Sequence, residues 1–247
     1  MLSNNNLYGE IPSALRNCTD IYILDLGDNK LSGEIPAWLG ERASSLLILR
    51  LRSNMFYGKI PSDICKLSSL HILDLAINNL SGSIPSCLGN LSGMASDVEY
   101  RYEGQLYVAT KGADKAKNQW FQAVNMLPSL EELHLPACGL STIPSSVPLV
   151  NLTSLSVLEL SNNGFNSSMP SWLFNLTGLV YVDLSSNNFQ GELPDQFADL
   201  KFIQHIDLSE NSFIEGKLST SLTALGSSPE KVWLTSGDQQ EDGNGNM

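Results

Sequence analysis

Several classes of protein are excluded by what this 247-residue sequence contains little of. Its 14 lysine and arginine residues stand against 26 acidic residues, and the net charge of −12 disfavours binding to nucleic acid or to an anionic membrane surface. No segment approaches the roughly 18 consecutive apolar residues of a transmembrane helix. The N-terminus, MLSNNNLYGEIP, has neither the basic nor the apolar part of a signal peptide. We therefore expect no direct insertion of this chain into a membrane.

Catalytic and metal-binding motifs are equally scarce. The three histidines, His71, His134 and His205, lie far apart in the sequence and have no metal-ligand spacing. No Cys-x-x-Cys, no glycine-rich phosphate loop after a strand and no Gly-x-Ser-x-Gly occurs. The sequence therefore predicts no catalytic residue, no metal site and no cofactor.

One pattern is repeated along most of the chain. Residues 70–85, LHILDLAINNLSGSIP, follow L-x-x-L-x-L-x-x-N-x-L-x-G-x-I-P, and we call the asparagine of this pattern the marker asparagine. The marker asparagines are Asn5, Asn29, Asn54, Asn78, Asn163, Asn187 and Asn211, and Cys138 takes the same slot in LEELHLPACGLSTIP. Apart from one long gap after Asn78, neighbouring markers lie 24 or 25 residues apart. This period and this leucine spacing are typical of a leucine-rich-repeat solenoid.

The physics of one repeat predicts the fold. Leu73 and Leu75 alternate with Asp74, as in a short strand with one buried face, and such a strand buries that face only by stacking on its neighbours. One asparagine per coil would then form a ladder that satisfies buried backbone groups at the turn. We expect an α/β-type solenoid, a right-handed superhelix with a parallel concave sheet and a mostly irregular or 3-10 convex side. The Cys138 coil is one residue short and should be locally irregular.

The phase of the repeats divides the chain into four parts. Residues 1–91 hold four coils, the first incomplete, and residues 92–119 form an insert loop. Coils resume over 120–226, and 227–247 form one degenerate coil followed by a disordered tail. In that last part, PEKVWLTSG fits an edge strand through Val232 and Leu234. Since the chain begins inside a repeat without a polar cap, we interpret it as a fragment.

Residues 35–94, IPAWLGERASSLLILRLRSNMFYGKIPSDICKLSSLHILDLAINNLSGSIPSCLGNLSGM, resemble the late repeats of plant leucine-rich-repeat receptor-like proteins of the ethylene-inducing-xylanase receptor type. The L-x-G-x-I-P element is specific to the plant class of repeat. WFQAVNMLPSLEELHLPACGL and LFNLTGLVYVDLSSNNFQGELP resemble early-to-middle repeats of the same receptors, although here they follow the insert. The order of the segments therefore suggests a rearranged ectodomain.

The insert resembles the island of these receptors, which carries a tyrosine, eight residues and then Lys-Gly. Tyr102 and Lys111-Gly112 have that spacing. The resemblance implies that these residues contact a ligand and a co-receptor, although a plain surface loop remains an alternative.

The polar residue between the last two strand leucines should point outward from the concave sheet. In chain order these residues are Asp25, Arg50, Asp74, His134, Glu159, Asp183 and Asp207. One interpretation is a solvated consensus face. The other is that the acidic column attracts a basic peptide or protein, while Arg50 and Arg52 seat a carboxylate.

Glycosylation sequons and cysteines recur in phase with the coils. Asn17, Asn90 and Asn175 lie 12 residues past their markers, Asn151 lies 13 past Cys138, and Asn166 adds a further acceptor. We interpret the sequon at Asn79, next to a marker, as a chance match. Cys65 and Cys87, 11 and 9 residues past their markers, are the candidate disulfide pair, although this phase difference strains the allowed Cα separation. We expect Cys18 to be unpaired and Cys138 to be a buried thiol.

The sequence thus predicts non-enzymatic recognition. By resemblance, the chain belongs to a plant cell-surface glycoprotein that perceives a peptide or protein elicitor in defence and signals through partner receptor kinases. Two alternatives stay open: a soluble inhibitor of a microbial wall-degrading enzyme, of the polygalacturonase-inhibitor type, and an inactive truncated receptor fragment.

Overall fold

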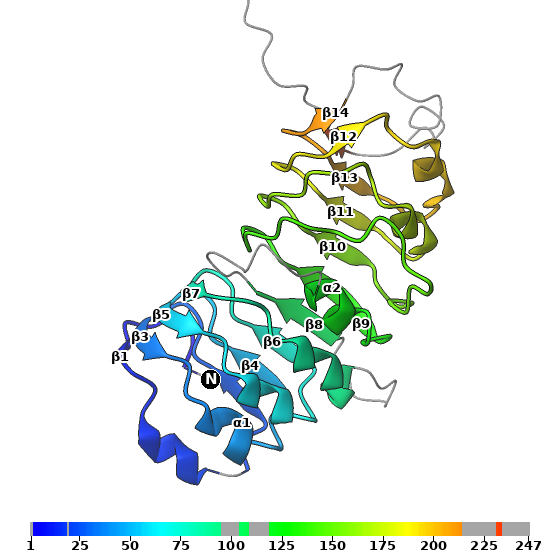
Figure 1. The fold of residues 1–247 in the computed structure, drawn as a ribbon. Coiled ribbons are helices and arrows are strands. Elements are labelled where there is room, and N and C mark those ends of the chain that lie inside the picture. Colours follow the sequence, from blue (N-terminus) through cyan, green and yellow to red (C-terminus); the bar gives the residue numbers. More distant parts are fainter. Residues whose placement is uncertain (1, 19, 95–103, 109–118, 214–230, 234–247) are drawn as a thin grey trace, which may run out of the picture.

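The computed structural model describes residues 2–18, 20–94, 104–108, 119–213 and 231–233 (Figure 1). Within these residues the chain winds as a solenoid whose main layer is a parallel sheet of nine strands, which we call the concave sheet. Its strands, in spatial order, are β2 (Ile23–Asp25), β4 (Ile48–Arg50), β6 (Ile72–Asp74), β8 (Gly104–Tyr107), β9 (Leu130–His134), β10 (Val157–Glu159), β11 (Tyr181–Asp183), β13 (His205–Asp207) and β15 (Lys231–Trp233). The predicted leucine-rich-repeat fold with a parallel sheet is confirmed.

Two smaller parallel sheets form where the chain leaves the concave sheet. Four strands make the first, β1 (Tyr8–Gly9), β3 (Lys30–Glu34), β5 (Met55–Lys59) and β7 (Asn79–Ser81), and β12 (Gln190–Gly191) pairs with β14 (Ser212–Phe213) in the second. They come from the N-x-L-x-G part of the repeat, where adjacent coils lie close enough for the backbones to pair.

Short helical turns cover the side opposite the concave sheet (Figure 1). They are the 3-10 turns η1 (Ser13–Asn17), η2 (Ser62–Lys66), η3 (Ser86–Asn90), η4 (Ser92–Met94), η5 (Ser171–Asn175) and η6 (Asp195–Asp199), with the helices α1 (Trp38–Arg42) and α2 (Gln119–Val124). All 3-10 turns except η4 follow directly on the proline of an I-P or equivalent element, whose fixed φ suits the start of a turn. In η1, for example, the carbonyl of Pro12 accepts the N–H of Leu15 at 3.0 Å.

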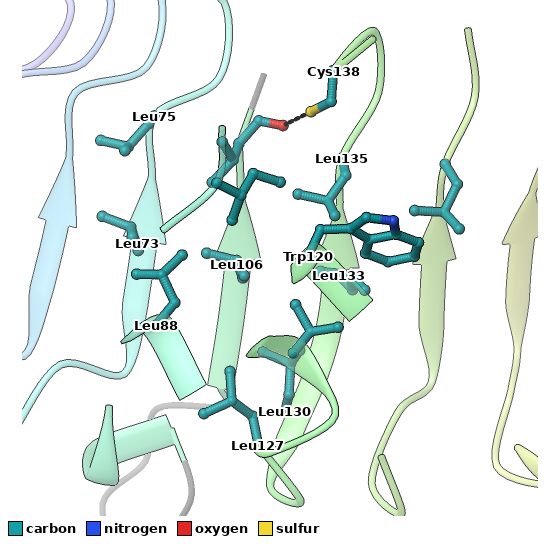
Figure 2. Close-up of a cluster of buried hydrophobic side chains, with 14 of the residues drawn as sticks. Leu73, Leu75, Leu88, Leu106, Trp120, Leu127, Leu130, Leu133, Leu135 and Cys138 are labelled. Carbon is teal, nitrogen blue, oxygen red and sulfur yellow. Dashed lines mark hydrogen bonds between the residues drawn. The ribbon is translucent and has the colours of Figure 1, made fainter. Parts of the chain in front are cut away.

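The core is one continuous stack of leucines between the sheet and these turns. Leu73, Leu106 and Leu133 lie side by side in register on β6, β8 and β9, and each is at most 1% exposed (Figure 2). Helix α2 adds Trp120, whose indole N–H donates to the carbonyl of Thr142 at 3.0 Å. Because each coil shares its buried face with two neighbours, no coil has a separate core.

A side-chain amide closes the turn after six strands of the concave sheet: β2, β4, β6, β10, β11 and β13. In its own coil, Asn187 donates to the carbonyls of Leu184 (3.1 Å) and Ser185 (3.0 Å). It also donates to Leu160 O of the preceding coil (3.0 Å) and accepts the N–H of Phe165 from that coil (3.3 Å). The same set of bonds recurs at Asn29, Asn54, Asn78, Asn163 and Asn211. The predicted asparagine ladder is confirmed.

Cys138 keeps part of this ladder. Its buried thiol donates to the carbonyl of Val108 in the preceding coil at 3.0 Å, where a marker asparagine would donate an N–H (Figure 2). The ladder therefore continues through the irregular coil with a weaker donor.

The insert predicted as a loop over 92–119 contains a strand instead, which corrects that prediction. Strand β8 pairs with β6 on one side and β9 on the other, with a register irregularity between Gly104 and Gln105. The reason is visible in the sequence, because Leu106 and Val108 alternate with polar neighbours and both are fully buried. The insert thus supplies one strand of the concave sheet, and η4 and the start of α2 also fall within 92–119.

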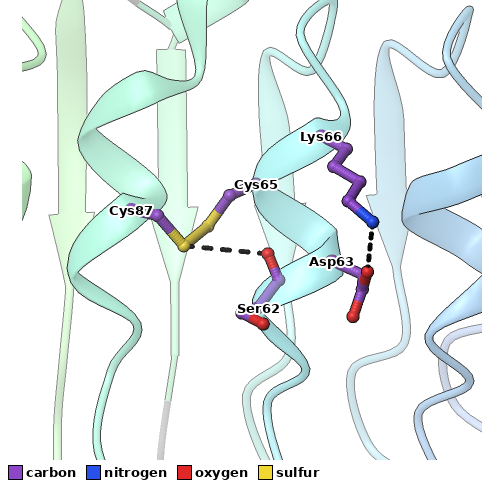
Figure 3. Close-up of a disulfide and its surroundings, with 5 residues drawn as sticks. All are labelled: Ser62, Asp63, Cys65, Lys66 and Cys87. Atoms are coloured by element: carbon purple, nitrogen blue, oxygen red, sulfur yellow. Dashed lines mark hydrogen bonds and ion pairs between the residues drawn. A yellow bond between two sulfur atoms is a disulfide. The ribbon is translucent and has the colours of Figure 1, made fainter.

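The structure joins Cys65 of η2 to Cys87 of η3 in a disulfide, with a Cα–Cα distance of 5.7 Å (Figure 3). Cys65 lies two positions later in its 3-10 turn than Cys87 does in its own. Because a 3-10 turn rotates about 120° per residue, this difference turns the two side chains about 240° relative to each other, and they leave the two turns on facing sides. Cys18 is exposed and forms no disulfide, and Cys138 is a buried thiol, as predicted. At the other end, the predicted degenerate strand is present as β15, with Val232 opposite Ile206.

Removing one rung of the ladder should destabilise the solenoid. Asn187→Ala removes four hydrogen bonds from a buried site and leaves the N–H of Phe165 without the acceptor it has there, so we expect a loss of roughly 3 kcal/mol in the free energy of unfolding. Asn188→Ala, at the exposed neighbouring position, is the matched control and should change it by less than about 0.5 kcal/mol. Urea unfolding measures both, and equal effects would refute the ladder's role.

Removing the disulfide should also destabilise the fold. It links residues 22 apart in sequence, and a crosslink closing a loop of that length contributes about 3 kcal/mol. Cys65→Ser with Cys87→Ser should lower the urea midpoint under non-reducing conditions, whereas Cys18→Ser should leave it unchanged. A double variant as stable as the parent chain would contradict the pairing.

Candidate functional site on the concave sheet

One row of side chains runs across the strands of the concave sheet. In register from coil to coil it contains Asp25, Arg50, Asp74, Tyr107, His134, Glu159, Asp183 and Asp207. The structure therefore brings the predicted concave residues into one continuous row and adds Tyr107, which sequence reasoning missed. The Leu-Tyr-Val alternation at 106–108 was the signal that would have found it.

The centre of the row is a connected polar cluster. The rings of Tyr107 and His134 stack with centroids 4.1 Å apart and an interplanar angle of 14°. The Tyr107 hydroxyl donates to Glu132 Oε2, and His134 Nδ1 donates to Glu159 Oε2 at 2.5 Å. His134 Nε2 lies 3.4 Å from Glu132 Oε2. The cluster thus links three neighbouring strands and fixes the orientation of each side chain.

The Tyr107 phenol is held in its neutral, donating form. Burial raises the pKa of Tyr107, and the hydrogen bond to Glu132 and the negative charge of that residue raise it further. Tyr107 therefore presents a stable hydrogen-bond donor to Glu132 throughout the physiological pH range.

Two arginines lie near the N-terminal end of the row: Arg50, in the row between Asp25 and Asp74, and Arg52, just after strand β4. Arg52 Nη1 lies 3.9 Å from Asp74 Oδ2, while Arg50 has no ion-pair partner among the described residues. Burial raises the pKa of Asp74. The hydrogen bond that Asp74 accepts from the Ala76 N–H (3.2 Å) and the charges of the two arginines act in the opposite direction and lower this pKa. The Arg52 side chain is 43% exposed, so solvent weakens that pair. Within the described residues Arg50 therefore has no ion pair within 4.0 Å, and its charge acts on Asp74 and Tyr107.

The C-terminal end of the row is acidic. Asp183 accepts the N–H and hydroxyl of Ser185, Asp207 accepts the N–H of Ser209, and each uses only its Oδ1 in these bonds. Beside them the rings of Tyr181 and His205 stack 4.5 Å apart at 6°. Burial raises the pKa of Tyr181, and the charges of nearby carboxylates add to the effect. Strands β9, β10, β11 and β13 contain no lysine or arginine.

The predicted glycosylation residues lie off the concave sheet. Asn17, Asn90 and Asn175 are each the exposed last residue of a 3-10 turn, Asn166 is exposed and Asn151 is partly exposed. Their occupancy stays a prediction. The island residues Tyr102, Lys111 and Gly112 lie outside the described residues.

Two further searches cover only the described part of the chain. It holds no group of three or more histidine, cysteine, aspartate or glutamate side chains placed to bind a metal ion. None of its helices has both the length and the apolar character needed to cross a membrane.

Comparisons with known proteins agree with this architecture. Family models described as Leucine Rich Repeat and Leucine rich repeat match residues 1–18, 20–41, 45–67 and 69–91, and residues 153–213, together more than half of the chain. Receptor-like proteins EIX1 and EIX2 of Solanum lycopersicum are 52% identical over 61 residues and 48% identical over 64 residues. These matches cover 23% and 24% of this chain but only 6% of each relative.

Solved plant receptor ectodomains have the same fold. The Arabidopsis receptor kinase HAESA, solved with the peptide hormone IDA and the co-receptor SERK1, aligns over 85% of this chain and 33% of its own, with 30% identity and a TM-score of 0.73. The plant peptide hormone receptor RGFR1, solved with RGF2, aligns over 86% of this chain and 32% of its own, with 25% identity and a TM-score of 0.70. The chain therefore belongs to the leucine-rich-repeat family, and its matched segments are similar to those of plant receptor-like proteins. This similarity supports a ligand-recognition role.

The buried carboxyl of Asp74 should make stability depend on pH. Because the pKa of Asp74 is raised in the folded state, the folded chain binds the carboxyl proton more tightly than the unfolded chain does. As pH rises through the raised pKa, the carboxyl loses this proton in a buried site and then disfavours folding. Asp74→Asn should raise Tm at pH 7 by a few degrees, the size of a change of about 1 kcal/mol. The gain should vanish below about pH 3, where the carboxyl is protonated in both states.

Asp25→Asn is the control for that experiment. Asp25 accepts an equivalent turn hydrogen bond from Gly27 (3.1 Å) but is less buried than Asp74. Thermal unfolding followed by circular dichroism measures both variants. A Tm gain at Asp74 that is the same at pH 3 and pH 7 would contradict the explanation by burial.

Proposed function

We propose that this chain is the ligand-recognition part of a plant cell-surface receptor-like protein. In this proposal it perceives a peptide or protein elicitor in defence, and it signals through partner receptor kinases. The proposal places the chain on the extracellular side of the plasma membrane with glycans on its flanks. The chain itself is not an enzyme.

The observation that carries this proposal is the charge division along the concave row. Arg50, which has no ion-pair partner in the described chain, lies between Asp25 and Asp74 in the N-terminal half of the row. Asp183 and Asp207 lie at the other end, with no basic residue on their own strands. Between them the Tyr107–His134 cluster gives a fixed polar surface. An extended peptide with a basic part at the acidic end and a carboxylate at Arg50 complements this row.

The structural relatives support the same kind of ligand and partner. HAESA was solved with a peptide hormone and a co-receptor, and RGFR1 with RGF2. Since this chain aligns with about a third of each of those chains, the ligand, the co-receptor and signalling remain part of the proposal.

The acidic end of the row provides a direct test. A peptide selected from a random library on the immobilised chain should bind less tightly to Asp183→Asn/Asp207→Asn, and its affinity should depend less on salt. Asparagine retains a side-chain oxygen for the Ser185 and Ser209 bonds, so the variant removes charge and keeps the turn. Titrations at two or more salt concentrations measure the change.

Glu192→Gln/Asp199→Asn is the matched control, because it removes two charges from exposed positions off the concave sheet in the same half of the chain. Its affinity and salt dependence should equal those of the parent chain. An unchanged salt dependence in the Asp183/Asp207 variant would refute the concave site.

A further inference from the structure

A second surface lies on the flank of the first coils. A groove of about 1020 Å³ runs between the four-stranded sheet and the segments that lead into η1, α1 and η2 (Figure 1 shows these elements). Its lining comes from the G-x-I-P elements of successive coils, and no residue of the concave sheet contributes to it. The groove is therefore separate from the concave row.

Flat rings form much of its walls. Tyr57, which is 48% exposed, lines the side of the small sheet, and the partly buried Trp38 lines the side of α1. Pro12, Pro36 and Pro61 lie along the same groove, one from each coil. Grooves lined by aromatic and proline rings suit an extended or polyproline-type chain, whose side chains pack between the rings.

Two carboxylates lie across the groove because the next coil has glycine beneath them. A Cβ on Gly33 would lie 2.8 Å from Cγ of Glu10, and a Cβ on Gly58 would lie 3.0 Å from Oε1 of Glu34. Both glycines have positive φ, at 97° and 78°, which also disfavours other residues there. The repeat therefore places Glu10 and Glu34 one coil apart, a spacing of about 5 Å.

Neither carboxylate is neutralised by the described part of the chain. Glu10 and Glu34 are exposed and form no ion pair there. Lys59, one coil further on, lies over Gly82 and likewise has no ion-pair partner among the described residues. A planar guanidinium has the donors to bind two neighbouring carboxylates, and it also stacks on aromatic rings.

We propose that this groove docks an extended polypeptide that presents arginine. Its guanidinium binds between Glu10 and Glu34, and its apolar or proline residues pack against Tyr57 and Trp38. A neutral oligosaccharide would also stack on these rings but would leave both charges uncompensated. The groove gives the receptor-like chain a docking site for a protein partner that is independent of the concave ligand site.

The test uses the peptide acetyl-Arg-Pro-Pro-Arg-Pro-Pro-amide and isothermal titration calorimetry on the full chain. The peptide should bind, more weakly at high salt, and Glu10→Gln/Glu34→Gln should weaken binding about tenfold or more. Glu192→Gln/Asp199→Asn is the control, because it also removes two negative charges but outside the groove, and Glu192 follows Gly191 as Glu34 follows Gly33. The affinity of this variant for the peptide should stay within about twofold of that of the parent chain. Tyr57→Ser should weaken binding while the carboxylates remain.

Three results would overturn the proposal. The first is no measurable binding of the peptide, and the second is equal weakening by the two double variants, which would reflect net charge alone. The third is a loss of peptide binding in the Asp183→Asn/Asp207→Asn variant but not in the Glu10→Gln/Glu34→Gln variant. That result would place the peptide on the concave sheet. Binding of cellohexaose that neither glutamine substitution changes, with none of the peptide, would identify the groove as a sugar site instead.

Discussion

The turns after β2, β4, β6, β10, β11 and β13 of the concave sheet each depend on one side-chain amide. The residue before every marker has a left-handed backbone, including Ile77 with φ at 52°, which is costly for a β-branched residue. The marker asparagine offsets this cost, because its amide bonds to carbonyls of its own coil and to both a carbonyl and an N–H of the preceding coil. Since these bonds join one coil to the next, the ladder fixes the register of the sheet as well as the shape of each turn.

The chemistry of the concave row follows from that register. Polar residues at the same phase of successive coils lie side by side, so Tyr107 stacks on His134 and Glu159 accepts from His134. The same constraint keeps like charges together at the acidic end, where strands β9, β10, β11 and β13 contain no lysine or arginine. The resulting surface is preorganised, which lowers the conformational entropy that a ligand must overcome on binding.

The flank groove arises from the same repeat by a different route. Glycine recurs where the small sheet leads into the I-P element, and the missing Cβ gives the preceding coil's side chain room to cross. Because the first coils carry Glu10 and Glu34 at that phase, the repeat produces a charged groove there. Backbone periodicity therefore supplies the scaffold, and a few variable positions supply the recognition chemistry.

The periodic features were predictable from sequence, and the features that break the period were not. Marker spacing predicted the parallel sheet, the asparagine ladder and the buried thiol of Cys138. It missed β8 because Lys111, three residues after Val108, stands where a marker asparagine would be expected. It also left the Cys65–Cys87 pair in doubt, since linear spacing does not show which way each side chain leaves a 3-10 turn. The small sheets had no separate signal, because they depend on contact between coils.

The concave row is continuous through β8, which pairs with β6 and β9. Amide hydrogen exchange by NMR measures this directly, because Leu75 and Val108 donate their N–H groups to Tyr107 O and His134 O within the sheet. We predict that the amides of Leu106 and Val108 exchange as slowly as those of Leu73 and Leu133 in the flanking strands. Exchange of residues 104–108 at the rate of an exposed loop would contradict it, and would divide the row into two separate halves.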